Sequence, residues 1–478
     1  MNQKSSRLLG LFFTGLFIVI PSLFATSLAT IHTEIQELHI FELEEPKSNW
    51  RKHLPFVAIG ETTLVASYPQ SSGIHGYPVS GEIQIFSKGA VDTQWTPIKT
   101  IYNSDPPDER VGDRLGSWPL LDGDTLMVAA LGDDDDAGAI FVYERNLGGV
   151  NNWGFRTKIV PDVRYSDQEF GRGALDGDTL VVGTPNAGTN YTGEAFIFSR
   201  NEGGADNWGQ VKRLEASNAS INDFFGSAVA VHGTIVVVSA PRADGGNGLN
   251  SGIIYVFEQD EGGANNWGEA HQLVSNTSLV NELLGEGTLE FDGDLLYAKV
   301  KHAYTESEPQ GGITVFEFDG PSASDWSQLA TIRAPVLERL GSDSQNLQRF
   351  DVQGDRVVMQ VTARPLNQPN LNTSNVYILE RDQGGVNNYG LVSELLICRS
   401  DADGILPVYN NSSAYLALYD EQVVLSTAFS SSNLLDPDTH DLSIYAFDLG
   451  VETSCEYRVP MCWALPTQTA NRFGFVCL

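Results

Sequence analysis

The stretch from Phe170 to Gly209, FGRGALDGDTLVVGTPNAGTNYTGEAFIFSRNEGGADNWG, decides the fold. It begins with a Phe-Gly pair and alternating small apolar residues, and then reaches an Asp-Gly-Asp triplet at 176–178. Because glycine accepts positive φ, this triplet predicts a tight type I′ hairpin turn between two strands. The apolar run at 180–182 predicts a second strand covered on both faces. Pro185 ends that strand, since proline cannot donate to a ladder.

The second half of the same stretch predicts two further strands. Residues 195–198 are aromatic or small and apolar, which favours a third strand, and a Gly-Gly-x-x-Asn-Trp turn leads to a fourth. We expect the aromatic residue of this turn to pack between neighbouring sheets, because a ligand site rarely repeats in most units of an array. It recurs as Trp153, Trp208, Trp267, Trp326 and Tyr389.

This four-stranded unit recurs along the whole chain. Aligned on the hairpin turn, the copies follow one another at steps of 54 to 66 residues. Their turn residues are Glu61, Gly123, Gly177, Gly233, Gly293, Gly354 and Asp420. Seven such units close radially, because an open array would leave strand edges exposed. We therefore predict an all-β fold, a seven-bladed β-propeller of four-stranded antiparallel blades, over residues 30–450.

Two segments compete to complete the last blade. Residues 34–43 (EIQELHIFEL) precede the first copy and alternate like a strand. We expect them to supply the outer strand of the seventh blade. The alternative is that residues 455–459 do so.

The composition limits the classes of partner. Lys and Arg number 29 against 61 Asp and Glu, so the formal net charge is −32. Nucleic-acid binding is excluded because it needs basic patches that replace counterions, and docking on anionic membranes is disfavoured for the same reason. Hydrophobic residues make up 41% of the chain, enough to build a core. We expect a monomer.

The N-terminus has the features of a secretory signal peptide. Lys4 and Arg7 precede an apolar run from Leu8 to Ile20, and small residues around Ala29 suit a signal peptidase. We expect residues 1–29 to be removed, no transmembrane segment to remain, and the product to be extracellular, periplasmic or displayed on the cell surface. Residues 451–478 form a cysteine-containing tail. In an exported chain the cysteines are disulfide candidates, with the pairing open, and they are Cys398, Cys455, Cys462 and Cys477.

The quoted motifs resemble the FG-GAP repeat family, the repeat of integrin α-subunit propellers, and especially its bacterial secreted form. The similarity covers residues 55–450 and is strongest in copies two to four. It implies an extracellular propeller with a role in adhesion or other interactions. Calcium-binding members carry an Asp-x-Asp-x-Asp-Gly loop between strands one and two. Here the Asp-Gly-Asp hairpins are too short to wrap an ion that needs six to eight oxygens.

The sharpest acidic feature is the run Asp133, Asp134, Asp135 and Asp136. Four adjacent carboxylates repel one another unless a cation or solvent screens them. The run is therefore a candidate calcium site, with a solvated acidic turn as the alternative. The fold itself requires no cofactor. Asp401 and Asp403 form a fragment of a calcium loop, but Arg399 occupies the place of its leading acid.

The loops indicate where a partner binds. Strand 1–2 and 3–4 turns are short and uniform, whereas the 2–3 segments vary from 7 to 13 residues, and varied loops on one rim indicate a binding face. No metalloprotease, nucleophile-elbow or phosphate-loop motif occurs, so we expect no enzyme. Trp118 stands near the axis, where we expect small residues in the other copies, and a stacking role is an alternative to packing.

We therefore predict a non-enzymatic propeller that binds a protein or glycan through the face of its 2–3 and 4–1 loops. Two alternatives stay open. One is a carbohydrate-active propeller enzyme with carboxylates in its central channel, and the other is a structural exoprotein without a specific ligand. Acids and aromatic side chains clustered at the channel mouth would favour the enzyme.

Overall fold

The structure is a computed structural model. It describes residues 30–33, 36–39, 55–70, 80–89, 94–103, 112–246, 248–277, 279–301, 311–320, 325–333, 345–363, 373–396, 398–401, 404–407, 415–430, 440–449, 463–464 and 475–476. The predicted signal peptide before Thr30, the competing segment 455–459, and Cys455, Cys462 and Cys477 lie outside the described residues.

Seven four-stranded units follow one another along the chain. The first blade consists of β3 (Phe56–Ile59), β4 (Thr63–Tyr68), β5 (Glu82–Ser87) and β6 (Thr96–Tyr102). The second consists of β7 (Leu115–Asp122), β8 (Thr125–Ala130), β9 (Ala139–Glu144) and β10 (Gly154–Ile159). The third consists of β11 (Arg172–Asp176), β12 (Thr179–Thr184), β13 (Glu194–Ser199) and β14 (Gly209–Leu214).

The next two units are β15 (Val229–His232) to β18 (Trp267–Leu273) with β16 (Ile235–Ala240) and β17 (Ile253–Gln259), and β19 (Leu289–Asp292) to β22 (Trp326–Arg333) with β20 (Leu295–Val300) and β21 (Gly312–Phe318). The sixth is β23 (Gln345–Gln353) to β26 (Gly390–Leu396) with β24 (Arg356–Ala363) and β25 (Thr373–Glu380), and the seventh contains β29 (Leu416–Tyr419), β30 (Gln422–Ser430) and β31 (His440–Asp448). Short hairpins β27–β28 (Cys398–Asp401, Gly404–Pro407) and β32–β33 (Trp463–Ala464, Phe475–Val476) lie outside the blades.

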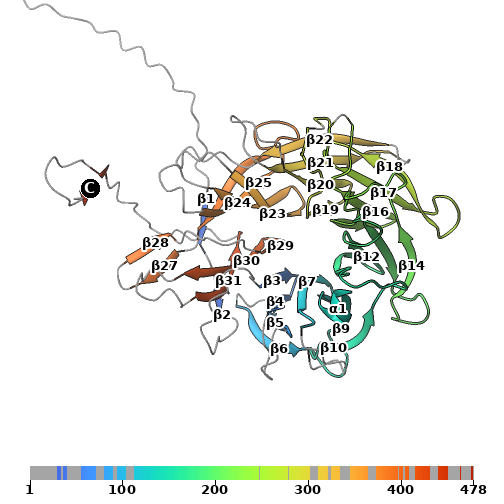
Figure 1. Ribbon diagram of the computed structural model, residues 1–478. Coiled ribbons are helices and arrows are strands. Elements are labelled where there is room, and N and C mark those ends of the chain that lie inside the picture. The colour runs from blue at the N-terminus through green and yellow to red at the C-terminus, as the bar shows by residue number, and fades with distance from the viewer. Residues whose placement is uncertain are drawn as a thin grey trace, which may run out of the picture.

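Each blade is an antiparallel sheet whose strands pair in chain order, and the first strand of each blade contacts the first strands of its two neighbours. Figure 1 shows the blades arranged around a common centre, with β3, β7, β23 and β29 close to it. This confirms the predicted seven-bladed β-propeller. In the described residues no helix is long and apolar enough to cross a membrane.

The N-terminal segment closes the ring. β2 (Gln36–His39) pairs antiparallel with β31, opposite Ser443 to Ala446, and becomes the outer strand of the seventh blade. The prediction for residues 34–43 is therefore confirmed over four of them. The strand before it, β1 (Thr30–Thr33), pairs parallel with β26 and adds a fifth strand to the sixth blade. Together they cover two outer edges that would otherwise be exposed.

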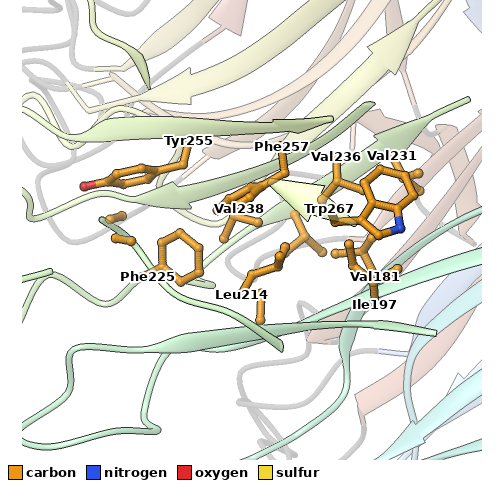
Figure 2. Packing of buried hydrophobic residues seen from close by; sticks show 14 of the residues in the cluster. Val181, Ile197, Leu214, Phe225, Val231, Val236, Val238, Tyr255, Phe257 and Trp267 are labelled. Carbon is orange, nitrogen blue, oxygen red and sulfur yellow. The ribbon is translucent and has the colours of Figure 1, made fainter. Parts of the chain in front are cut away.

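The core lies between the blades rather than within any one of them. In Figure 2, Phe225 of the fourth blade faces Tyr255 and Phe257, with ring centroids 5.3 and 6.1 Å apart in edge-on geometry. The same cluster includes Val181 of the third blade and Trp267 of the fourth. The recurrent tryptophans of the Gly-Gly-x-x-Asn-Trp turns thus pack between neighbouring sheets, as expected. Trp153, Trp208 and Trp267 are all buried.

Close backbone contact explains one of the recurring glycines. Gly193, which precedes β13, has φ of 84° and forms a parallel bridge with Phe225 of the next blade. A Cβ at this position would lie 1.9 Å from the Phe225 carbonyl oxygen. Only glycine tolerates both the left-handed backbone and the approach, so the residue that starts strand three also fixes the spacing between two blades.

The hairpin turns differ from the prediction in type. At Gly177 the φ is 56°, but the following Asp178 does not have positive φ. Positive φ at the first central residue alone is the type II′ pattern, so the predicted type I′ turn is wrong. Asp176, before the turn, accepts a hydrogen bond from the backbone N–H of Gly233 in the next blade at 2.6 Å. Asp122 likewise accepts one from Gly177 at 3.1 Å. These aspartates join successive turns.

Candidate functional site

The varied loops lie together on one face and pair across blade boundaries. The N–H of Asn222, in the loop before β15, donates to the Asn190 carbonyl of the preceding 2–3 loop at 3.0 Å. At the next boundary the Asn281 N–H donates to the Leu249 carbonyl at 2.8 Å. At these two boundaries the 2–3 loop is therefore held against the following 4–1 loop. We call this surface the loop face, and the opposite surface with the uniform hairpins the turn face.

A hollow of about 860 Å³ opens on the loop face between the third, fourth and fifth blades. Amide side chains, a carboxylate pair and two cations line most of it. The lining residues include Asn218, Asn222, Asp223, Arg242, Asp244, Asn250, Asn281 and Lys301. Ile221 and Leu249 also line it, and these residues are 62% and 63% exposed. The hollow thus combines hydrogen-bonding groups with exposed aliphatic surface, which is typical of a ligand site.

Exposed apolar side chains gather on the same face. Of the thirteen large apolar residues that are exposed in the described part of the chain, eight belong to 2–3 or 4–1 loops. They are Val163, Tyr165, Tyr191, Ile221, Leu249, Val274, Leu279 and Val280. The turn face carries only Val150 and Val386 among these thirteen. Unevenly distributed apolar surface of this kind marks an interaction site.

The acidic run that sequence singled out forms a compact turn, α1 (Asp133–Asp136), after β8. Asp134, Asp135 and Asp136 all have left-handed φ, between 55° and 61°. Asp133 is buried, and its carboxylate contacts Lys158 at 2.5 Å and Arg164 at 3.0 Å.

Further ion pairs hold the rest of that turn. Arg164 also contacts Asp134 at 2.8 Å, and Arg114 contacts Asp136 at 2.5 Å. Basic side chains of this chain thus compensate three of the four carboxylates. Within the described ranges, no group of three or more His, Cys, Asp or Glu side chains is arranged to hold a metal ion. Calcium binding by Asp133 to Asp136 stays a prediction.

Two further predicted site residues lie on the short strand β27. Cys398 begins β27, and Asp401 ends it. Cys398 and the three tail cysteines therefore stay disulfide candidates. The Asp-Gly-Asp residues at 122, 176 and 292 sit before the turns, where Asp122 and Asp176 cap the next hairpin.

One residue from the first strand of each blade lies at the same height around the axis of the propeller. In every blade this residue lies five positions before the turn residue, near the loop-face end of the first strand. We call these seven residues the axial ring. They are Phe56, Trp118, Arg172, Ala228, Thr288, Arg349 and Tyr415. Trp118 reaches its place through a bulge between Ser117 and Leu120, with φ of 43°.

Five ring members touch in sequence around the axis. Arg172 stacks over Trp118 at 4.9 Å, and Trp118 meets Phe56 edge-on at 5.5 Å. The ring of Phe56 lies 3.9 Å from that of Tyr415, over which Arg349 stacks at 3.7 Å. The result is an arc of three aromatic rings with a guanidinium at each end. The two remaining members, Ala228 and Thr288, are small and lie between the two arginines in blade order.

The arc is electrostatically unusual because, among the described residues, its two arginines lack a carboxylate in salt-bridge contact. In the described residues neither Arg172 nor Arg349 forms a salt bridge. Burial lowers the pKa of both arginines, and the nearby Tyr415 side chain acts in the opposite direction and raises it. Arg172 also lies near enough to lower the pKa of Arg349 further, while Glu169 acts on Arg172 in the opposite direction. Both arginines nevertheless stay charged at neutral pH.

A pair of acids lies two residues further along the same strands. Glu290 and Asp351 belong to adjacent blades, and burial raises the pKa of both, with Asp351 raising that of Glu290 further. Asp351 accepts hydrogen bonds from the backbone N–H of Leu418 at 2.7 Å and of Val352 at 2.8 Å. Glu290 has no such anchor. The charge of Asp351 therefore disfavours ionisation of Glu290, as expected for two interacting carboxyls.

Sequence analysis found only one member of this arrangement. We expected Trp118 to be alone among small residues, which is wrong, because five of the seven ring positions carry large side chains. Comparing the copies column by column, five and three residues before each turn, would have shown the arginines and the acids. The contacts between them depend on ring closure and could not be predicted in this way.

Residues 208–257 match the FG-GAP repeat model, which confirms the predicted resemblance for the segment from Trp208 to Phe257. No curated protein matches the chain significantly. Among solved structures, the periplasmic gluconolactonase of Pseudomonas aeruginosa is 14% identical, with a TM-score of 0.45 over 81% of this chain and 96% of that one. The β-propeller domain of the trilobed protease from Pyrococcus furiosus is 12% identical, with a TM-score of 0.40 over 83% and 96%. The WD40 domain of SCAP from fission yeast is 13% identical, with a TM-score of 0.39 over 85% and 98%.

Proposed function

We propose that this FG-GAP-containing propeller is an exported interaction module that binds a glycan through its loop face. The observation that carries the proposal is the hollow between the third, fourth and fifth blades. Asparagine side chains supply both donors and acceptors for vicinal hydroxyl groups, and the exposed Ile221 and Leu249 offer apolar surface for the C–H face of a sugar ring. Export follows from the predicted signal peptide at 1–29.

A glycan fits this surface better than a protein partner of ordinary size. Protein interfaces have an apolar centre that is depleted of charged residues. Here the hollow itself is polar, with charged lining residues such as Arg242 and Asp244, and the aliphatic side chains are a minor part of it. A protein partner on the same face is the alternative outcome of the test below.

The test is direct binding of the chain from residue 30 to an array of neutral and acidic oligosaccharides, followed by calorimetric titration of each bound glycan. A double variant, Ile221→Gln with Leu249→Gln, removes apolar surface at the hollow. We expect it to weaken binding about thirtyfold, since each of the two lost aliphatic contacts contributes roughly 1 kcal/mol.

The matched control changes exposed aliphatic residues on the opposite face. Val150 is 89% exposed in a turn-face hairpin, so Val150→Gln with Val386→Gln should leave affinity within twofold. Equal loss in both variants, or binding insensitive to either, would remove the loop face from the proposal. Absence of any glycan binding together with stoichiometric binding of a purified protein would replace the glycan by a protein partner.

One observation favours a second function, a carbohydrate-active enzyme. The acids Glu290 and Asp351 lie near the axis in adjacent blades, and two interacting carboxyls with raised pKa are suited to general acid–base chemistry. Incubation of a bound oligosaccharide with the protein, followed by mass spectrometry, tests it. Product that disappears in Glu290→Gln would establish catalysis, and an unchanged oligosaccharide would leave binding as the function.

A further inference from the structure

We infer that the axial ring binds an anionic group, the carboxylate of an acidic saccharide, between Arg172 and Arg349. This inference deepens the proposed function and rests on it for the saccharide as the ligand class. The site is formed by blades three to six, next to the hollow but separate from it.

The axial ring has small side chains on one side and aromatic side chains on the other. Going around the axis from Arg172, the next two members are Ala228 and Thr288, and then comes Arg349. The other three members are large aromatic residues that occupy the opposite side in mutual contact. The two positions between the arginines therefore carry the smallest side chains of the ring, and Arg172 and Arg349 remain partly accessible to solvent.

Arg172 and Arg349 can both donate further hydrogen bonds to a ligand. Each guanidinium lies over an aromatic ring, that of Trp118 or Tyr415, and Arg349 also hydrogen-bonds to the Tyr415 side chain. With five N–H donors each, both groups can still donate to a ligand. Their N–H edges form the fork that matches a carboxylate in two parallel hydrogen bonds. The aromatic partners also hold each fork in place, which reduces the entropy lost when a ligand binds.

The positive charge of the two arginines also favours an anionic ligand. Two guanidinium groups that repel each other, in a chain of net charge −32, have no carboxylate in salt-bridge contact within the described part of the structure. Lys299 adds a third cation near Arg349, with its ammonium 3.1 Å from the Gln348 carbonyl oxygen. The nearest acids that act on these cations are Glu169 and Glu286, and neither is in salt-bridge contact with them. A bound anion would supply the missing compensation.

The surroundings of the two arginines favour a carboxylate that is carried by a sugar. Trp118 and Tyr415 flank the site with aromatic surface on which a pyranose ring can stack. Lys301, two residues after Lys299, lines the hollow, so the ring and the hollow meet at the end of β20. A saccharide chain can thus place a hydroxyl-bearing unit in the hollow and an acidic unit at the axis. The half-buried acids Glu290 and Asp351 lie two residues further along the same strands, and their negative charge, where ionised, opposes a doubly charged anion more than a singly charged one.

The experiment is calorimetric titration of the chain from residue 30 with tetragalacturonate, with its fully methyl-esterified form, and with inorganic phosphate. We expect the acid to bind and the ester to bind at least about tenfold more weakly, because charged hydrogen bonds are lost. Arg172→Gln and Arg349→Gln should each weaken binding of the acid by about tenfold or more. Binding should also weaken as salt is raised from 50 to 300 mM, since the attraction is screened.

Two further variants make the result specific. Lys99→Gln changes the charge by the same amount on the outer strand β6, away from the axis, and should leave affinity within twofold. Arg349→Lys keeps the charge but loses the fork, and we expect intermediate affinity. This variant also serves if Arg349→Gln fails to fold, which thermal unfolding will reveal.

Several results overturn the inference. Equal binding of ester and acid would leave glycan binding at the loop face intact but remove the carboxylate site. Phosphate that competes at the same concentration as tetragalacturonate would make the ring a general anion site. Failure of all three probes to bind would overturn the inference without affecting neutral glycans found on the array. Acid binding that depends on the arginines but not on Ile221 and Leu249 would support the ring and remove the hollow.

Discussion

At the residue scale, carboxylates on the inner strands differ in role because they differ in position. Asp176 caps the hairpin of the next blade, and Asp351 accepts one backbone hydrogen bond from Leu418 of the seventh blade and one from its own neighbour Val352. Glu290 sits at the same height as Asp351 but accepts no hydrogen bond in the described structure, so nothing offsets its burial. Its ionisation therefore costs folding free energy.

The pH dependence of stability follows from this. Because burial raises the pKa of Glu290 above its unfolded value, the folded state holds the proton more tightly, and stability is lost as pH rises from the unfolded toward the folded pKa. Glu290→Gln removes this loss. We expect the variant to become progressively more stable relative to the wild type as the pH rises from 4.5 to 8.

Denaturant unfolding of both proteins at several pH values measures the difference. Glu317→Gln, on the outward part of β21, is the control and should shift stability by a constant amount. A difference between wild type and Glu290→Gln that stays constant over this range would show that Glu290 is ionised without penalty.

At the element scale, the ring is closed by two four-residue strands from one end of the chain. β1 and β2 pair with consecutive blades, β26 and β31, before the first blade begins. The seventh blade otherwise has only β29, β30 and β31. Its outer edge would then expose unpaired backbone groups, which favours edge-to-edge association.

Removing these strands should therefore weaken the whole ring. We expect a chain that starts at residue 45 to melt about 5 °C or more below a chain that starts at residue 30, since several inter-strand hydrogen bonds are lost. Differential scanning calorimetry measures the shift. In the full-length context, Leu38→Pro should produce part of the same loss by removing one donor from β2. Identical melting of the two chain lengths would show that β1 and β2 do not contribute to closure.

At the scale of the whole molecule, charge and metal dependence are linked. A net charge of −32 repels itself, so any divalent salt should stabilise the fold by screening. Specific calcium binding would add to this effect. The acidic turn at 133–136, however, already has Arg114, Lys158 and Arg164 in contact with three of its carboxylates.

We therefore expect calcium and magnesium at equal ionic strength to raise the melting temperature by the same amount, within about 1 °C, relative to EDTA. Calcium needs six to eight oxygen ligands, and breaking the existing ion pairs would oppose binding. Thermal unfolding in the three buffers measures it. A calcium-specific rise that disappears in Asp133→Asn with Asp135→Asn would instead establish the predicted site at this turn.

Much of this protein could be predicted from its sequence because its fold is a sum of local repeats. The Phe-Gly pair, the turn glycine and the apolar second strand each specify structure within a few residues, and they recur with one period. The alternating segment before the first copy predicted closure for the same reason. The turn type was predicted wrongly because the sequence Asp-Gly-Asp suits more than one turn, and the backbone at Asp178 is set by the sheet on either side.

The candidate site depends on the tertiary structure. Arg172 lies in the third blade and Arg349 in the sixth, with two blades between them along the chain, and no local motif marks either as a binding residue. They approach each other only because seven blades close into a ring, which places the fifth residue before every turn at one height around a single axis. Radial closure converts a column of unrelated residues into neighbours, and that conversion depends on the number of blades and their register rather than on any local sequence preference.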